Sequence, residues 1–158
     1  MQDAGIPALR TVAAYQYGAG AGRALFPGDE EFRVRRSTTG RPQQVAREDG
    51  QRLVSVGMDG RLTLGAAGGR RLVDALDYPR ARVVVGDESE PFVRDGKNVF
   101  AKFVQAVDGD ARQGDELAVV HEDGDLLAVG RAELDAQSML DFDAGMAVKV
   151  RDGVEAGD

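Results

Sequence analysis

Two of the protein's three lysines lie close together in the segment 96–104, which reads GKNVFAKFV. Lys97 and Lys102 alternate there with apolar residues, a pattern that predicts a short β-strand. Successive side chains of a strand point to opposite faces, so Asn98, Phe100 and Lys102 would share one face. Two ammonium groups, an amide and an aromatic ring beside open backbone suit phosphates and an unstacked base, as at an RNA end. The alternative is that both lysines simply pair with nearby carboxylates.

Other residues that could do chemistry are weaker candidates. The segment GAGAGR (18–23) follows a predicted helix rather than a strand, so it indicates a helix end or close packing rather than a dinucleotide site. The segment GAAGGRR (65–71) opens a helix whose amides could approach a phosphate, but it lacks the Gly-Lys-Ser/Thr of a P-loop. His121 is the only histidine, and we expect it to face solvent or to pack at a strand end. No cysteine is present, which excludes disulfides, thiolate chemistry and Cys-ligated zinc. We therefore expect no catalytic residue, no metal site and no cofactor.

The charges are unevenly distributed along the chain. Residues 1–79 contain eleven arginines and nine acidic residues, whereas residues 80–158 contain nine basic and eighteen acidic residues. Seventeen of the 20 basic residues are arginines. Few lysines and many carboxylates favour a halophilic protein over an ordinary acidic one. At ~1 M salt the Debye length is only about 3 Å, so contacting groups rather than net charge would select a partner.

The elements that must position these residues change character near residues 78–79. Before this point, apolar residues at helical spacing alternate with strand patterns and with Asp-Gly turns at 49–50 and 59–60. Arg33 and Arg35 would lie side by side on the solvent face of a strand, because they alternate with Phe32 and Val34. The expected elements are helices at 7–17 and 66–76, a strand around 32–35, and a strand in which Val54, Val56 and Met58 alternate.

The second half is predicted to be mostly strand. Ser89 can cap a short helix, and Gly96 suits the position just after its end. Residues 114–122 and 125–134 flank a turn and predict a hairpin. Many short strands between Gly and Asp residues favour a closed or nearly closed barrel. The remaining expected elements are strands at 81–85, 98–104 and from 146 onward, and a short helix around 137–142.

Two long segments of the second half, RVVVGDESEPFVRDGKNVFAKFV and GDELAVVHEDGDLLAVGRAELDAQSMLDFDAGMAVKVRDG, resemble a PUA domain. They are similar to the PUA domain that ends archaeal tRNA-guanine transglycosylase and its relative, archaeosine synthase. Upstream, LRTVAAYQYGAGAGRALFP and FRVRRSTTGRPQQV resemble the small α+β domain that precedes PUA in those enzymes. The family's catalytic barrel, its active-site aspartates and its Cys/His zinc ligands have no counterpart in this sequence. We expect an α+β domain at 1–79, a mostly-β PUA pseudo-barrel with one or two short helices at 80–153, and a tail at 154–158.

The resemblance implies an RNA-binding protein linked to archaeal tRNA modification, which grips the acceptor stem and 3′ end and is not itself an enzyme. Lys97 and Lys102 would contact phosphates, while Gly96 lets the backbone approach a nucleotide. Phe100 would either stack on a base or belong to the core. Carried over by motif position, the RNA contacts are Arg94, Gly96, Lys97, Asn98, Val99, Phe100, Lys102, Lys149 and Arg151, with Arg33, Arg35, Arg36 and Arg41 extending the track in the first domain.

Two other functions remain open at this point. The chain could be the non-catalytic subunit of a split archaeosine transglycosylase or synthase, acting mainly through protein–protein contact. An autonomous enzyme is the least favoured reading, because it would need converging acid and base groups in a pocket. The expected partners are tRNA or another structured RNA and, for the subunit, a catalytic tRNA-modifying chain; neither DNA nor a membrane is expected. The lack of cysteines and of an apolar leader favours a cytoplasmic location.

Overall fold

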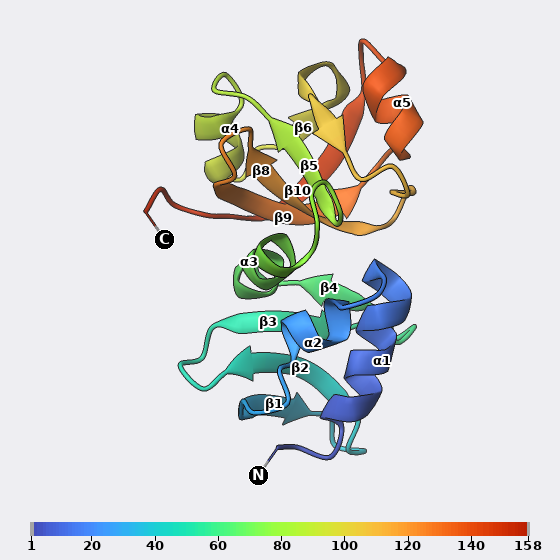
Figure 1. Cartoon of the computed structure of the whole chain (residues 1–158), viewed down its shortest axis with the longest axis vertical. Helices are drawn as coiled ribbons and strands as arrows, with labels where there is room; N and C mark the ends of the chain where they lie inside the picture. Colours follow the sequence, from blue (N-terminus) through green and yellow to red (C-terminus); the bar gives the residue numbers. More distant parts are fainter. Residues whose placement is uncertain (1, 158) are drawn as a thin grey trace. The chain divides into compact units, whose positions relative to one another are not determined.

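The computed structural model describes residues 2–157 and divides the chain into two compact units, residues 1–76 and 77–158 (Figure 1). Each unit has its own sheet and its own helices. Within the described residues, no helix is both long enough and apolar enough to cross a membrane.

The first unit packs helices against a four-stranded antiparallel sheet with the strand order β1-β2-β3-β4. Its core contains the fully buried side chains of Leu25, Phe26, Leu53 and Leu72. The elements are α1 (Ile6–Tyr17), α2 (Ala21–Leu25), β1 (Phe32–Arg36), β2 (Pro42–Arg47), β3 (Arg52–Val56), β4 (Leu62–Leu64) and α3 (Ala66–Ala75).

Tight turns connect β2 to β3 and β3 to β4, as the Asp-Gly pairs predicted. Gly50 and Gly60 have positive φ angles of 91° and 82°. Asp49 Oδ1 accepts a hydrogen bond from the Gln51 amide at 3.1 Å, the self-closing turn that short acidic side chains favour. The strand prediction through Met58 was wrong, because β3 ends at Val56 and Met58 lies in the next turn with 92 % of its surface exposed.

The glycine-rich segments serve close packing. A Cβ atom at Gly22 would lie 2.5 Å from the Arg10 carbonyl oxygen, so α2 can approach α1 only with glycine there. This confirms the packing interpretation of GAGAGR. At the start of α3, a Cβ atom at Gly68 would collide with the Leu53 carbonyl oxygen of β3. The Gly65 amide donates to that same oxygen at 2.9 Å, so the start of this helix faces its own sheet.

The second unit is a six-stranded, half-barrel-like sheet with the order β6-β10-β9-β8-β5-β7 and three short helices. The predicted hairpin is confirmed as β8 and β9, which pair antiparallel across residues 122–125. Strands β5 and β8 pair in parallel, with Val85 opposite His121. The elements are β5 (Arg82–Val85), α4 (Glu90–Arg94), β6 (Val99–Phe100), the 3₁₀ helix η1 (Ala101–Phe103), β7 (Ala106–Val107), β8 (Glu116–His121), β9 (Leu126–Ala132), α5 (Ala136–Asp141) and β10 (Met146–Gly153).

The strand expected at 98–104 was only partly right. Just two residues, Val99 and Phe100, pair with β10, and the chain then turns into η1. The amide of Ala101 donates to the Gly145 carbonyl at 2.9 Å and ends the ladder. Ala101 is nevertheless buried and Lys102 exposed, so the period-2 pattern misled about backbone shape but not about burial. Ser89 occupies the N-cap position of α4, as expected, but its side chain makes no capping hydrogen bond.

Candidate functional site

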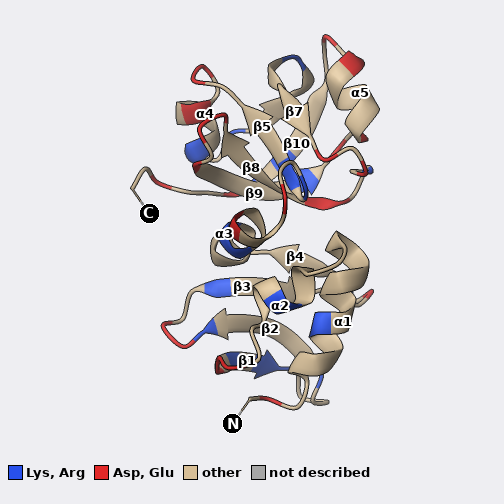
Figure 2. Cartoon of the chain, viewed as in Figure 1, with Lys and Arg blue, Asp and Glu red and all other residues tan. Residues whose placement is uncertain are grey.

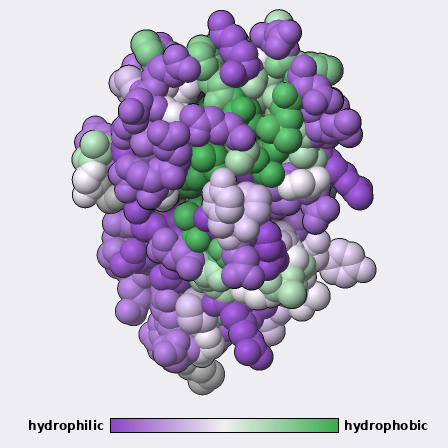
Figure 3. Space-filling model, turned by 45° about the horizontal axis from the view of Figure 1, so that its top comes forward, coloured by the Kyte–Doolittle hydropathy of each residue, from purple (hydrophilic) through white to green (hydrophobic). Residues whose placement is uncertain are grey.

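A groove of about 640 Å³ lies beside α4 and β6. The rings of Phe92, Phe100 and Phe103 line it together with Lys97 and Asn98. Phe92 is 62 % exposed and Phe100 is 49 % exposed, so neither ring belongs to the core. The second unit also shows apolar surface gathered between hydrophilic residues, in the upper part of Figure 3. An apolar, ring-lined groove in so acidic a domain is a surface fit for a flat ligand.

The position of Lys97 is fixed by the way in which α4 ends. Gly96 has φ 91°, the left-handed conformation that terminates many helices. Its amide donates to the Val93 carbonyl at 3.0 Å, and the Lys97 amide donates to the Phe92 carbonyl at 2.9 Å. These two bonds form a Schellman motif, which turns the chain sharply and leads Lys97 into the groove lining.

Both lysine side chains of this segment are exposed. Among residues 2–157, neither ammonium group forms an ion pair with a carboxylate. Lys102 Nζ lies 5.0 Å from the centroid of the Phe103 ring. Lys102 lines a second hollow of about 380 Å³ with Asp143, and Phe100 and Phe103 line both hollows. The two amines therefore belong to adjoining hollows that share aromatic walls.

Three of the other predicted contacts in the second unit are engaged within the protein. Arg94 Nε pairs with Glu90 Oε2 at 3.0 Å, and its Nη1 donates to the Val154 carbonyl at 2.9 Å. Asn98 Oδ1 accepts a hydrogen bond from the Val150 amide at 2.9 Å.

The third engaged residue, Arg151, binds both carboxylate oxygens of Glu116, which is 5 % exposed. Val99 is buried, so only its backbone can meet a ligand. Lys149 is exposed on β10 opposite Arg131 of β9. Asn98 and Val99 line the groove, whereas Arg94, Lys149 and Arg151 do not.

The arginines predicted in the first unit fall into two groups. Arg33 and Arg35 are exposed on β1, the edge strand of the sheet, where basic residues colour the strand in Figure 2. Arg36 forms an ion pair with Asp3 and donates to the Gly40 carbonyl at 2.8 Å. Arg41 donates to the Gly57 carbonyl at 2.9 Å. Two of the four guanidinium groups thus help to hold loops of their own unit.

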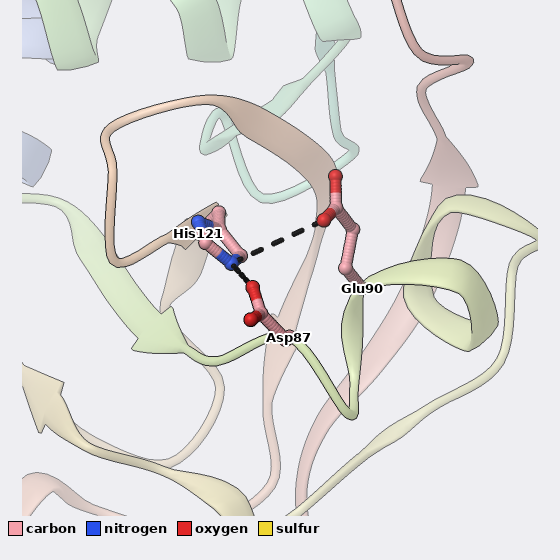
Figure 4. Close-up of side chains that lie close together, drawn as sticks. All are labelled: Asp87, Glu90 and His121. Carbon is pink, nitrogen blue, oxygen red and sulfur yellow. Dashed lines mark hydrogen bonds and ion pairs between the residues drawn. The ribbon is translucent and has the colours of Figure 1, made fainter.

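Sequence reasoning missed a cluster at the end of β8, where the His121 imidazole meets Asp87 and Glu90 (Figure 4). The imidazole also meets Asp123. The pKa of His121 is raised above its usual value, chiefly by the hydrogen bond to Asp87 and further by Asp123. The hydrogen bond from the Asp125 amide, and then the bond to His121, hold the pKa of Asp123 below its usual value. His121 and Asp87 are 34 positions apart, so no local spacing could have revealed the cluster.

The strand order and the groove describe a PUA-type barrel preceded by a small α+β domain. Comparison with known families supports both assignments. Residues 7–79 match the patch-forming domain C2 of tRNA-guanine transglycosylase, and residues 81–154 match the PUA domain. The chain therefore contains a PUA domain, preceded by a domain that matches the C2 domain of tRNA-guanine transglycosylase.

Full-length relatives agree with this assignment. The chain is 47 % identical over 148 residues to a tRNA-guanine(15) transglycosylase of Pyrococcus furiosus. The aligned region covers 93 % of this chain and 24 % of that enzyme. It is 46 % identical over 146 residues to the Methanothermobacter thermautotrophicus enzyme of the same name, covering 92 % and 22 % of the two chains. The chain thus spans about a quarter of the length of these relatives and matches only their non-catalytic C-terminal domains.

Solved structures share the fold. A hypothetical protein of Pyrococcus horikoshii superposes with a TM-score of 0.69 at 22 % identity, covering 94 % of this chain and 89 % of that one. A PUA domain from Aeropyrum pernix gives a TM-score of 0.68 at 20 % identity, covering 96 % and 82 %. At these identities the likeness concerns the fold alone.

Proposed function

We propose that this chain is a tRNA-binding protein whose PUA domain holds the unpaired end of the RNA in the α4–β6 groove. The observation that carries the proposal is the pair of exposed lysines, free of ion pairs within residues 2–157, beside exposed aromatic rings. Lys97 and Lys102 contact phosphates, while Phe92 and Phe100 stack on unpaired bases. The relatives' name, tRNA-guanine(15) transglycosylase, favours tRNA among structured RNAs.

The engaged residues have positioning roles in this proposal. Arg94 and Asn98 tie α4 and β6 to neighbouring segments, and the open backbone at Gly96 lets a nucleotide approach. Arg151 links β10 to β8 through its ion pair with Glu116. Lys149 is exposed and available for a phosphate contact. In the first unit, Arg33 and Arg35 are the two guanidinium groups best placed to contact the duplex backbone, because Arg36 and Arg41 are engaged in their own loops.

The acidic surface determines the conditions under which binding is strong. Residues 80–158 carry nine basic and eighteen acidic residues, so repulsion weakens RNA binding at low salt. In concentrated salt the repulsion is screened, and counterion release contributes little. Stacking and hydrogen bonds then dominate. This behaviour fits the halophilic and cytoplasmic setting that the composition favours.

The test is a titration of the full chain with tRNA in concentrated potassium salt, using tRNA with and without its 3′-terminal nucleotides. The double variant Lys97→Ala/Lys102→Ala is compared with wild type. Arg112→Ala is the matched control, because Arg112 is exposed in the same domain and lines neither hollow. We expect the lysine variant and the shortened tRNA each to lower affinity at least about tenfold, with no further loss when the two are combined. Equal affinities across this set would refute the groove assignment.

A second function, that of a non-catalytic subunit of a split transglycosylase, is favoured by one observation. Helix α1 presents exposed Pro7, Ala8, Ala14 and Tyr15, the last with 93 % of its surface open. In this arrangement the catalytic chain docks on α1, and this chain binds the RNA without catalysing the reaction. Co-elution with a transglycosylase catalytic chain that is lost in Tyr15→Glu, while the tRNA affinity of the isolated protein is unchanged, would support it.

A further inference from the structure

The cluster at the end of β8 has the composition of a metal site. His121 is 7 % exposed, and its Nε2 lies 2.6 Å from Asp87 Oδ1 and 4.0 Å from Glu90 Oε1. In Figure 4 both carboxylates point toward the same ring nitrogen. The three ligand atoms all lie within 4.8 Å of one another. In a bound site with metal–ligand distances of about 2.1 Å, neighbouring ligand atoms are about 3 Å apart, so Glu90 must move closer to the imidazole and Asp87 slightly away from it.

We propose that Asp87, Glu90 and His121 bind a divalent first-row transition-metal ion such as Zn²⁺ or Mn²⁺. One imidazole nitrogen with two carboxylate oxygens is a ligand set that such ions accept, whereas Mg²⁺ and Ca²⁺ prefer oxygen alone. The Asp87 side chain is 88 % exposed, so an ion can enter from solvent and water can complete its coordination. Glu90 Oε2 is held by Arg94 at 3.0 Å, which leaves Oε1 directed toward the imidazole.

Asp123 provides the outer-shell partner that metal-binding histidines usually have. Its Oδ1 lies 3.0 Å from His121 Nδ1. With Nδ1 protonated and donating to this carboxylate, Nε2 keeps its lone pair for the metal. The Asp123 amide also lies 3.1 Å from Nδ1 and suits the opposite tautomer, in which Nε2–H donates to Asp87. Metal binding therefore selects the tautomer in which Nδ1–H donates to Asp123 Oδ1.

The bound ion would link two segments that are far apart in the sequence and meet only in the folded domain. Asp87 follows β5, Glu90 opens α4, and His121 ends β8, which pairs in parallel with β5. The same α4 carries Phe92, which lines the groove. The ion thus anchors one wall of the groove; any effect on RNA affinity rests on the proposed function, whereas metal binding itself does not.

The experiment uses the full chain after removal of metals by a chelator, at about pH 8, where an ordinary imidazole is neutral. Because His121 is the only histidine, its ring proton signals in NMR spectra report on this site alone. We expect Zn²⁺ to shift these signals saturably at one equivalent, Mn²⁺ to broaden them, and Mg²⁺ to leave them unchanged. Calorimetric titration gives the affinity, and bound Zn²⁺ raises the thermal unfolding temperature.

Substitutions distinguish metal binding from protonation of the His121 imidazole, because both occupy the same ring nitrogen. We expect Asp87→Asn and Glu90→Gln each to weaken Zn²⁺ binding more than tenfold, and Asp123→Asn to weaken it about 10- to 100-fold. Glu88→Gln is the matched control, since it removes an equal charge from the same loop outside the ligand set. The proposal is overturned if Zn²⁺ leaves the His121 signals unchanged, or if Glu88→Gln weakens binding as much as Asp87→Asn.

Discussion

Replacing Gly96 with alanine isolates the energetic role of the helix end that positions Lys97. Gly96 has φ 91°, and no atom lies within 4 Å of the place where a Cβ atom would stand. The substitution therefore meets no steric neighbour, and its effect comes from the backbone conformation alone. An L-residue in the left-handed region is less stable than glycine by about 1–2 kcal/mol. We expect the free energy of unfolding to fall by that amount.

Gly109→Ala is the matched control for this measurement. Gly109 also has open space around its Cβ position, but its φ angle lies outside the positive range. Alanine there should leave stability unchanged or raise it by up to about 1 kcal/mol, because it restricts the unfolded chain. Thermal unfolding followed by circular dichroism compares the two variants; 1 kcal/mol corresponds to about 4–8 °C in a domain of this size.

The RNA titration adds a second measurement on the same variants. If the Schellman motif positions Lys97, Gly96→Ala should also weaken tRNA binding severalfold, whereas Gly109→Ala should not. Equal stability of the two variants would contradict the assignment of strain to the left-handed residue. A destabilised Gly96→Ala that binds tRNA like wild type would show that the helix end does not position the groove.

Three further substitutions test the second unit. Asp135 accepts a hydrogen bond from the Ser138 amide at 2.8 Å, which lowers its pKa, so Asp135→Ala should lower the thermal unfolding temperature by removing the cap of α5. The pKa of Asp135 in the folded state lies below its pKa in the unfolded state. The stabilisation by this hydrogen bond is therefore present above the unfolded-state pKa and is lost as the pH falls through the folded-state pKa. Measured by unfolding at several pH values, Asp135→Ala should lose less stability in acid than wild type does. Arg151→Leu removes a partner from buried Glu116 and should reduce the unfolding free energy by about 1–3 kcal/mol. Adding Glu116→Gln should restore part of that free energy, because it removes the unpaired buried charge. Phe100→Ala should weaken binding of unpaired RNA by about 1–3 kcal/mol in a titration with little change in melting temperature, since the ring is half exposed.

The parts of the fold that sequence reasoning predicted are those with local causes. The hairpin β8–β9 follows from two apolar runs around an acidic turn, and Gly96 follows from the need for a left-handed residue after a helix. Alternating burial around Lys102 was also predicted, but the 3₁₀ turn there was not. The backbone leaves the sheet after Ala101, where the Val104 amide bonds to the Ala101 carbonyl and closes the 3₁₀ turn, which the alternating pattern does not indicate.

The candidate site shows the same division. The exposure of Lys97 follows from its own segment, whereas the engagement of Arg151 by Glu116 depends on the order β10-β9-β8, in which the side chain of Arg151 reaches across β9. The cluster around His121 was invisible for the same reason, since parallel pairing of β5 with β8 brings Asp87 to the imidazole. Of the two expectations for His121, solvent exposure was wrong and packing at a strand end was confirmed.

The bond between Asn98 and Val150 has a consequence for synthesis on the ribosome. The two residues are 52 positions apart in the chain. At translation rates of about 5–20 residues per second, the segment that builds the groove emerges about 3–10 s before the strand that holds it in place. During that interval the aromatic rings and both amines are exposed on an unfinished domain. Under the proposed function, the nascent chain can therefore bind RNA only when β10 is complete.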